Sequence, residues 1–251
     1  MKAIRILAAI MIATILCSCK NDTSEAKTNA EEIKQKEFTS DTLTKHLKPF
    51  NKDLPTIGLL MYNGVLQSEV VATSDVFAKL TEEGKQIFNV VTIAETEKPI
   101  TTEEGLRLIP DYTFENSPEL KVLFVPSAYD MFAQVNNKKI VDFIREKNGE
   151  TEYTVSNCAG AQLIGQSGIA DGHKIVTWIG GGEQLQKDYP NLKVQNDSLV
   201  TYVKDGKFLS SNGNLASYIS ALELLEIMTS QEHRKFVESY LYLDRLQDWR
   251  E

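Results

Sequence analysis

Cys158 is the residue of this chain whose type and setting most clearly offer chemistry. The sequence holds three cysteines, and Cys17 and Cys19 both lie near the amino terminus, at the end of its apolar run. Cys158 is therefore the one thiol expected in the folded part, so no intramolecular disulfide is available to it. Two interpretations stay open from the count alone: a buried, inert core cysteine or a reactive nucleophile.

The residues around Cys158 favour the nucleophile. A short strand predicted at 152–156 runs into Asn157-Cys158-Ala159-Gly160, and a helix is predicted at 161–166. A nucleophile on a tight strand-to-helix turn projects above the sheet edge, with backbone N–H groups at the positive end of the helix beside it. This setting predicts a thiol pKa lowered by one or more units and an oxyanion site at the Ala159 N–H.

The amino terminus has the pattern of an export signal. Lys2 and Arg5 precede an apolar run at 6–16, which is too short to span a bilayer and suits a signal peptide. The run ends in Leu16-Cys17-Ser18-Cys19, which resembles a bacterial lipobox. We therefore predict a lipoprotein signal peptide at 1–18 and a lipid anchor on Cys19. An ordinary signal peptide or an N-terminal anchor helix is the alternative.

Residues 19–54 are predicted to form a polar tether, because they are rich in Lys, Glu, Thr, Asn and Ser and cannot bury enough apolar surface to fold. The expected location is the bacterial cell envelope, with membrane attachment through the anchor. Lys20 after the lipidated cysteine favours the outer membrane, facing the periplasm or the surface.

Composition excludes several classes of function. The formal net charge of -8 and the lack of a basic stripe argue against a nucleic-acid partner. No spacing typical of a metal cluster, a phosphate loop or a dinucleotide fingerprint occurs, so neither a metal nor a cofactor is predicted.

Residues 55–251 read as one α/β domain. Apolar runs at 56–62, 86–94, 121–125 and 174–178 predict strands, and they alternate with helical patterns at 67–80, 136–147 and 216–228. Continuous apolar strands are typical of a parallel sheet that is buried on both faces. The predicted architecture is a sandwich with a mainly parallel sheet and helices on both faces.

Four segments resemble the PfpI/ThiJ superfamily, the DJ-one-like group, which is kin to class I glutamine amidotransferase domains. They are IGLLMYNGVLQSEVVATSDVFA, VLFVPSAYD, VSNCAGAQLIGQSGIADGHKIVTW and DGKFLSSNGNLASYISALELLE. The nearest subgroup serves as sensor domains of AraC-type regulators and as isonitrile hydratases. The resemblance implies a flavodoxin-like fold, a small-molecule ligand and a homodimer.

By this resemblance Cys158 matches the elbow cysteine, and Glu69 matches the acidic residue that contacts the thiol. A carboxyl in a dry pocket can stabilise a thiolate or act as a general base. Further pocket or oxyanion positions are Ala159, Ser127, Ala128, Asn157 and Trp178.

Two departures from the family pattern leave the function open. Trp178 stands where many relatives carry a histidine, and Ser127-Ala128 stands where they carry Gly-Gly. The first hypothesis is a thiol-dependent hydratase, lyase or amidotransferase-like hydrolase acting on a small electrophile. The second is a non-catalytic ligand-binding or redox-sensing module that uses the same cysteine.

Overall fold

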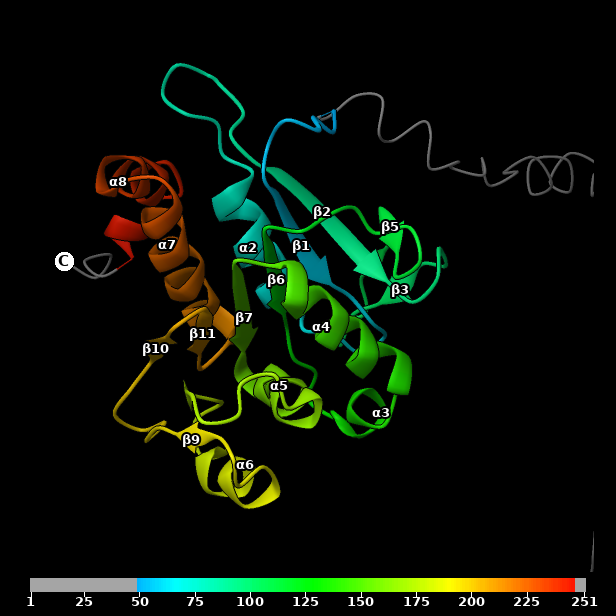
Figure 1. The fold of residues 1–251 in the computed structure, drawn as a ribbon. Helices are drawn as coiled ribbons and strands as arrows, with labels where there is room; N and C mark the ends of the chain where they lie inside the picture. The colour runs from blue at the N-terminus through cyan, green and yellow to red at the C-terminus, as the bar shows by residue number, and fades with distance from the viewer. Residues whose placement is uncertain (1–48, 247–251) are drawn as a thin grey trace, which may run out of the picture. The chain divides into compact units, whose positions relative to one another are not determined.

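The computed structural model describes residues 49–246 (Figure 1). The predicted signal peptide, Cys19 and most of the predicted tether lie outside the described residues. The described chain is already tied to the domain at Asn51, whose N–H donates to the side chain of Asn89 at 2.9 Å. The folded body thus begins slightly before the predicted boundary at residue 55.

A seven-stranded sheet forms the centre of the domain, in the spatial order β10-β11-β7-β6-β1-β2-β5. Its strands are β1 (Thr56–Leu60), β2 (Asn89–Ala94), β5 (Tyr112–Thr113), β6 (Val122–Val125), β7 (Tyr153–Asn157), β10 (Tyr202–Asp205) and β11 (Phe208–Ser211). Neighbouring strands are parallel, except that β10 and β11 form an antiparallel hairpin. Two small sheets pair β3 (Ile100–Thr101) with β4 (Arg107–Leu108) and β8 (Lys174–Ile175) with β9 (Lys193–Val194).

Helices cover both faces of the sheet (Figure 1). One layer contains α2 (Gln67–Phe77), α7 (Ser217–Met228) and α8 (Gln231–Tyr240). The other contains α3 (Phe132–Val135), α4 (Lys138–Glu150) and α5 (Ala161–Ser167), and α6 (Gly182–Asp188) lies beyond α5. Three 3-10 turns complete the elements of residues 49–246: η1 (Cys158–Gly160), η2 (Asn214–Ala216) and η3 (Leu243–Arg245). The predicted flavodoxin-like sandwich is confirmed.

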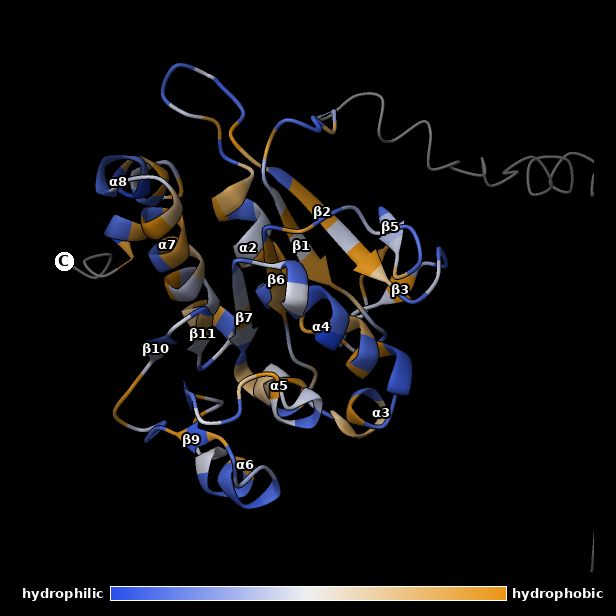
Figure 2. Cartoon of the chain, in the orientation of Figure 1, coloured by the Kyte–Doolittle hydropathy of each residue, from blue (hydrophilic) through white to orange (hydrophobic). Residues whose placement is uncertain are grey.

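The burial of the strands explains why the sheet is central. Every residue of β1 and β6 is buried, as expected for apolar strands covered by helices on both faces. Figure 2 shows these inner strands in hydrophobic colours, whereas much of α4 and α6 is hydrophilic. Phe77 of α2 meets Phe88 and Phe124 edge-on, with ring centroids 5.2 and 5.8 Å away, and so joins the helix layer to the sheet.

The strand predicted at 174–178 is shorter than expected, because β8 ends at Ile175. The residues after it lie outside any strand and are held by side chains instead, as the Val176 N–H donates to Ser210 Oγ at 2.9 Å. Strand β5 and helix α3 were not predicted; each has four residues or fewer, which is too short for a periodic pattern.

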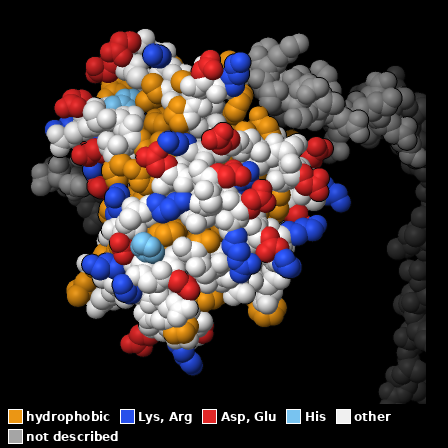
Figure 3. All heavy atoms as spheres, viewed as in Figure 1, with side chains coloured by type: hydrophobic (Ala, Val, Ile, Leu, Met, Phe, Trp, Pro, Cys, Tyr) orange, Lys and Arg blue, Asp and Glu red, His pale blue; other side chains and the backbone are white. Residues whose placement is uncertain are grey.

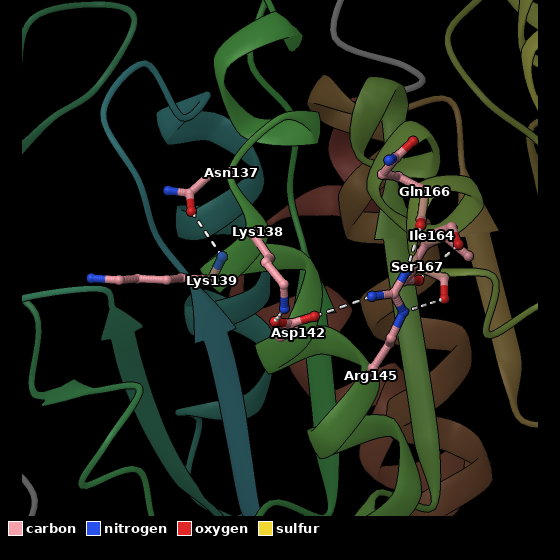
Figure 4. Close-up of polar contacts among 8 residues, drawn as sticks. All are labelled: Asn137, Lys138, Lys139, Asp142, Arg145, Ile164, Gln166 and Ser167. Atoms are coloured by element: carbon pink, nitrogen blue, oxygen red, sulfur yellow. Dashed lines mark hydrogen bonds and ion pairs between the residues drawn. The ribbon is translucent and has the colours of Figure 1, made fainter.

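Arg145 of α4 fixes the far end of α5, the helix that follows Cys158 (Figure 4). Its guanidinium donates to the carbonyl of Ser167 at 2.8 Å and to that of Gln166 at 3.1 Å. Carbonyls at a helix end lack partners within the helix, so a donor from a neighbouring helix both satisfies and anchors them.

Acidic and basic side chains intermingle on the face drawn in Figure 3. None of the helices between residues 49 and 246 is both long and apolar enough to cross a membrane.

The central strands should dominate stability. Leu123 of β6 is fully buried, whereas Leu199 is 81% exposed. Leu123→Ala should cost about 2–5 kcal/mol of unfolding free energy through lost burial and the remaining cavity, whereas Leu199→Ala should change it by less than about 0.5 kcal/mol. Urea denaturation measures both, and equal effects would contradict the assigned core.

Candidate active site

Cys158 occupies a strained elbow at the carboxyl end of β7. Its φ is +51°, in the left-handed region that residues other than glycine rarely adopt. Gly160 permits the turn, because a Cβ there would lie 2.3 Å from the carbonyl oxygen of Val125. Backbone strain of this kind costs about 1–3 kcal/mol and gathers at functional sites. The conformation therefore marks Cys158 as a candidate nucleophile.

Glu69 lies in the first turn of α2 and is almost completely buried, with 1% of its surface exposed. Its Oε2 accepts from the Ser127 N–H at 2.6 Å, and its Oε1 accepts from the Asn214 N–H at 3.1 Å. Ser127 follows β6 and Asn214 follows β11, so the carboxyl joins two loops at the carboxyl edge of the sheet. Open α/β sheets bind ligands at this edge, where neighbouring strands lead to helices on opposite faces.

Gly213 brings Cys158 and Glu69 together. A Cβ built on Gly213 would lie 2.1 Å from Cys158 Cβ and 2.4 Å from Glu69 Oε1. Since both atoms lie that close to one point, the sum of these distances, about 4.5 Å, is the upper limit of their separation. The Cys158 side chain and the Glu69 carboxyl are therefore neighbours.

Burial raises the pKa of Glu69 to about 7, although the N–H groups of Ser127 and Asn214 oppose the shift. An acid with such a pKa exchanges its proton near neutral pH, as a general acid or base requires. Tyr62 is also close: burial, Glu69 and Cys158 all raise its pKa, and its hydroxyl donates to the Pro126 carbonyl.

The prediction of an acidic thiol was wrong. Burial raises the pKa of Cys158 to about 11, and the Glu69 charge adds to the rise. The Ala159 N–H favours the thiolate, as predicted, but does not offset these effects. Helix α5 is only seven residues long and begins after η1, so it offers little field at the sulfur. At neutral pH the thiol keeps its proton.

The predicted oxyanion positions are only partly free. The Ser127 N–H is taken by Glu69, which removes it as an oxyanion donor in this arrangement. The Ala128 N–H points to Met131 Sδ at 3.1 Å, and a thioether is a weak acceptor that a substrate oxygen could displace. The buried Ser127 hydroxyl serves the two reactive groups instead, since its hydrogen bonding lowers the pKa of Glu69 and of Cys158 against the effect of burial.

Asn157 does not line the pocket as predicted. It is fully buried, and its Oδ1 accepts from Ser211 Oγ and Ser220 Oγ, both at 2.9 Å. This side chain ties β7 to β11 and α7 instead.

Trp178 is half-buried, and its indole covers Gly181, where a Cβ would lie 1.9 Å from the ring. The residue before it contacts the elbow directly, since Thr177 Oγ1 donates to the Cys158 carbonyl at 2.8 Å. His173 does not supply the histidine that the family resemblance leads us to expect: it lies near Asp205, and its ring is tilted against that of Phe208, at the far end of β11.

Thr177, Gly213 and Asn214 were missed from the sequence. The tripeptide Asn212-Gly213-Asn214 after an apolar strand signals a turn, but nothing local relates it to Glu69. Thr177 carries no sequence signal at all.

The domain's sequence relates it to known proteins. The model of the DJ-1/PfpI family matches residues 55–227. The chain belongs to the DJ-1/PfpI family. Isonitrile hydratase of Pseudomonas putida is 26% identical over 186 residues, which cover 74% of this chain and 77% of that protein.

Solved structures of this class share the fold. A ThiJ/PfpI family protein from Pseudomonas syringae matches with a TM-score of 0.68 and 20% identity, over 80% of this chain and 84% of that one. DJ-1beta of Drosophila melanogaster matches with a TM-score of 0.65 and 19% identity, over 75% and 98%.

The pKa of Glu69 predicts how stability depends on pH. Because the folded state raises this pKa from 4.5 to about 7, the folded protein holds a proton that the unfolded chain loses between these values. The stabilisation that comes from this proton is fully present below about pH 4.5 and is lost as pH rises through about 7. The free energy of unfolding should therefore fall by about 3 kcal/mol over this range.

Urea denaturation from pH 4.5 to 8, compared between wild type and Glu69→Gln, tests this. The glutamine variant should lack this part of the pH dependence, and Glu82→Gln, an exposed control, should retain it. An unchanged profile in Glu69→Gln would contradict the assignment.

Proposed function

We propose that this protein is a cysteine-dependent enzyme that hydrates a small electrophile, with an isonitrile as the first candidate. The observation that carries the proposal is the buried pair of Cys158 and Glu69, in which a strained thiol adjoins a carboxyl whose pKa is about 7. The isonitrile hydratase relative supports the choice of substrate. No histidine is needed, because the carboxyl can move the thiol's proton.

In the first step, the Glu69 carboxylate takes the proton from Cys158 Sγ and passes it to the terminal carbon of R–N≡C. The sulfur bonds to the same carbon, which gives the thioimidate R–N=CH–S–Cys158. A protonated thiol with a high pKa is suited to this route, because the same proton that leaves the sulfur is needed on the carbon.

In the second step, water adds to the thioimidate carbon while Glu69 takes a proton from the water. The nitrogen is protonated, the carbon–sulfur bond breaks and Cys158 regains its proton. The product is the formamide R–NH–CHO, and one water is consumed in each cycle. The N–H groups of Ala159 and Ala128 are the donors best placed for the developing charge.

A panel of alkyl isonitriles, small carbonyl compounds and amides, assayed by NMR, tests the proposal. Cys158→Ala should abolish turnover, and Glu69→Gln should lower kcat by about 10²- to 10⁴-fold, since proton transfer then lacks its base. Glu82→Gln is the control, because this exposed acid follows α2 and is not among the groups that shift the pKa of Glu69. If wild type turns over nothing while peroxide oxidises Cys158 stoichiometrically, the redox-sensing alternative replaces the enzyme.

The chain's location and assembly are also part of the proposal. The lipobox-like Leu16-Cys17-Ser18-Cys19 and the polar stretch after it support export and a lipid anchor in a bacterial envelope. Family membership, together with exposed apolar side chains of α2, η2 and α7, supports a homodimer that binds a small molecule. These side chains are Val71, Leu215, Ile219 and Ile227.

The anchor has its own test. In a bacterial host, the wild type should partition with membranes and carry a diacylglyceryl mass on Cys19, whereas Cys19→Ala should be unlipidated and should not partition with membranes. Cys17→Ala is the matched control and should remain lipidated. Membrane attachment of Cys19→Ala without any change in mass would refute the lipoprotein assignment.

A further inference from the structure

The loop from Ser211 to Asn214 packs against both reactive side chains. Gly213 lies at its centre with a φ of +86° and is buried. A side chain at this position would meet Cys158 Cβ on one side and Glu69 Oε1 on the other. Both neighbours are held in place, one by the elbow backbone and one by two N–H groups, so neither can yield easily.

Each of the other residues of this loop holds a different part of the site. The Asn214 N–H donates to Glu69 Oε1 at 3.1 Å, and Ser211 Oγ donates to Asn157 Oδ1 at 2.9 Å. The Asn212 amide donates to the Thr177 carbonyl at 2.7 Å, and Thr177 in turn donates to the Cys158 carbonyl. A shift of the loop therefore moves the acid and the elbow together.

We propose that the loop Ser211–Asn214, with Gly213 at its centre, is a positioning element that sets the separation of the Cys158 thiol and the Glu69 carboxyl. The inference rests on the proposed function in that the reaction uses this pair. It concerns the coupling of the two groups, however, and this coupling is measurable without any substrate.

The coupling has a direct readout in the reaction of Cys158 with iodoacetamide at pH 9. At this pH Glu69 is ionised and its charge raises the pKa of the thiol. Glu69→Gln removes the charge, so alkylation should become about three- to tenfold faster, because each pKa unit changes the thiolate fraction about tenfold. The ratio of the two rates measures the coupling.

The test is a double-mutant cycle. In a Gly213→Ala background, Glu69→Gln should accelerate alkylation by less than about 1.5-fold, because the inserted methyl separates the carboxyl from the thiol. Gly168→Ala is the matched control: its φ of +70° imposes similar strain, but a Cβ there meets nothing within 4 Å. This control should keep the full wild-type ratio.

Asn212→Ala provides a second variant, should Gly213→Ala fail to fold by circular dichroism. It removes the bond to Thr177 without adding bulk, and it should also lower the ratio. A wild-type ratio in folded Gly213→Ala, or in Asn212→Ala if the glycine variant does not fold, would overturn the proposal. Failure of turnover on every substrate would leave these ratios untouched, so the two proposals fail separately.

Discussion

The buried carboxyl of Glu69 is the constraint on which the site depends. A buried carboxyl is no longer hydrated, so it is costly unless protein groups donate hydrogen bonds to it. The backbone N–H groups of Ser127 and Asn214 donate to Glu69. These donors belong to loops far apart in sequence, so satisfying one acid fixes the ends of β6 and β11 against the start of α2. Burial and the two N–H groups act on the pKa in opposite directions, and their balance near 7 leaves the acid able to exchange a proton.

The same burial decides the state of the nucleophile. Cys158 sits in a strained turn beside an acid, and both the loss of water and the neighbouring charge hold its proton on the sulfur. The pocket therefore does not favour the thiolate form of Cys158 at neutral pH. It provides a protonated thiol beside a carboxyl. In the proposed mechanism the two share proton transfer, which suits a reaction in which sulfur and hydrogen add to one carbon.

The sequence predicts the sheet well and the site only in part. Continuous apolar runs such as Thr56–Leu60 have one stable placement, a strand covered on both faces, and the elbow follows from a strand that meets small residues. Glu69 came from family resemblance, since its nearest partners lie 58 and 145 residues away along the chain. The shift of the thiol pKa was predicted in the wrong direction, because the burial that raises it is a property of the assembled fold. Asn157 was misplaced because the partners that hold its side chain, Ser211 and Ser220, lie 54 and 63 residues away along the chain.

The surroundings of Trp178 show how the elbow of this chain is held without a histidine at that position. The segment before Trp178 holds the elbow, because Thr177 Oγ1 donates to the Cys158 carbonyl and the Asn212 amide donates to the Thr177 carbonyl. At position 178, where the family resemblance leads us to expect an imidazole, an indole packs on Gly181. The indole has no proton to exchange near neutral pH. The geometry of the nucleophile is thus separable from the base that serves it. With the elbow intact and the indole inert, the carboxyl of Glu69 is the adjoining group able to move the proton of Cys158.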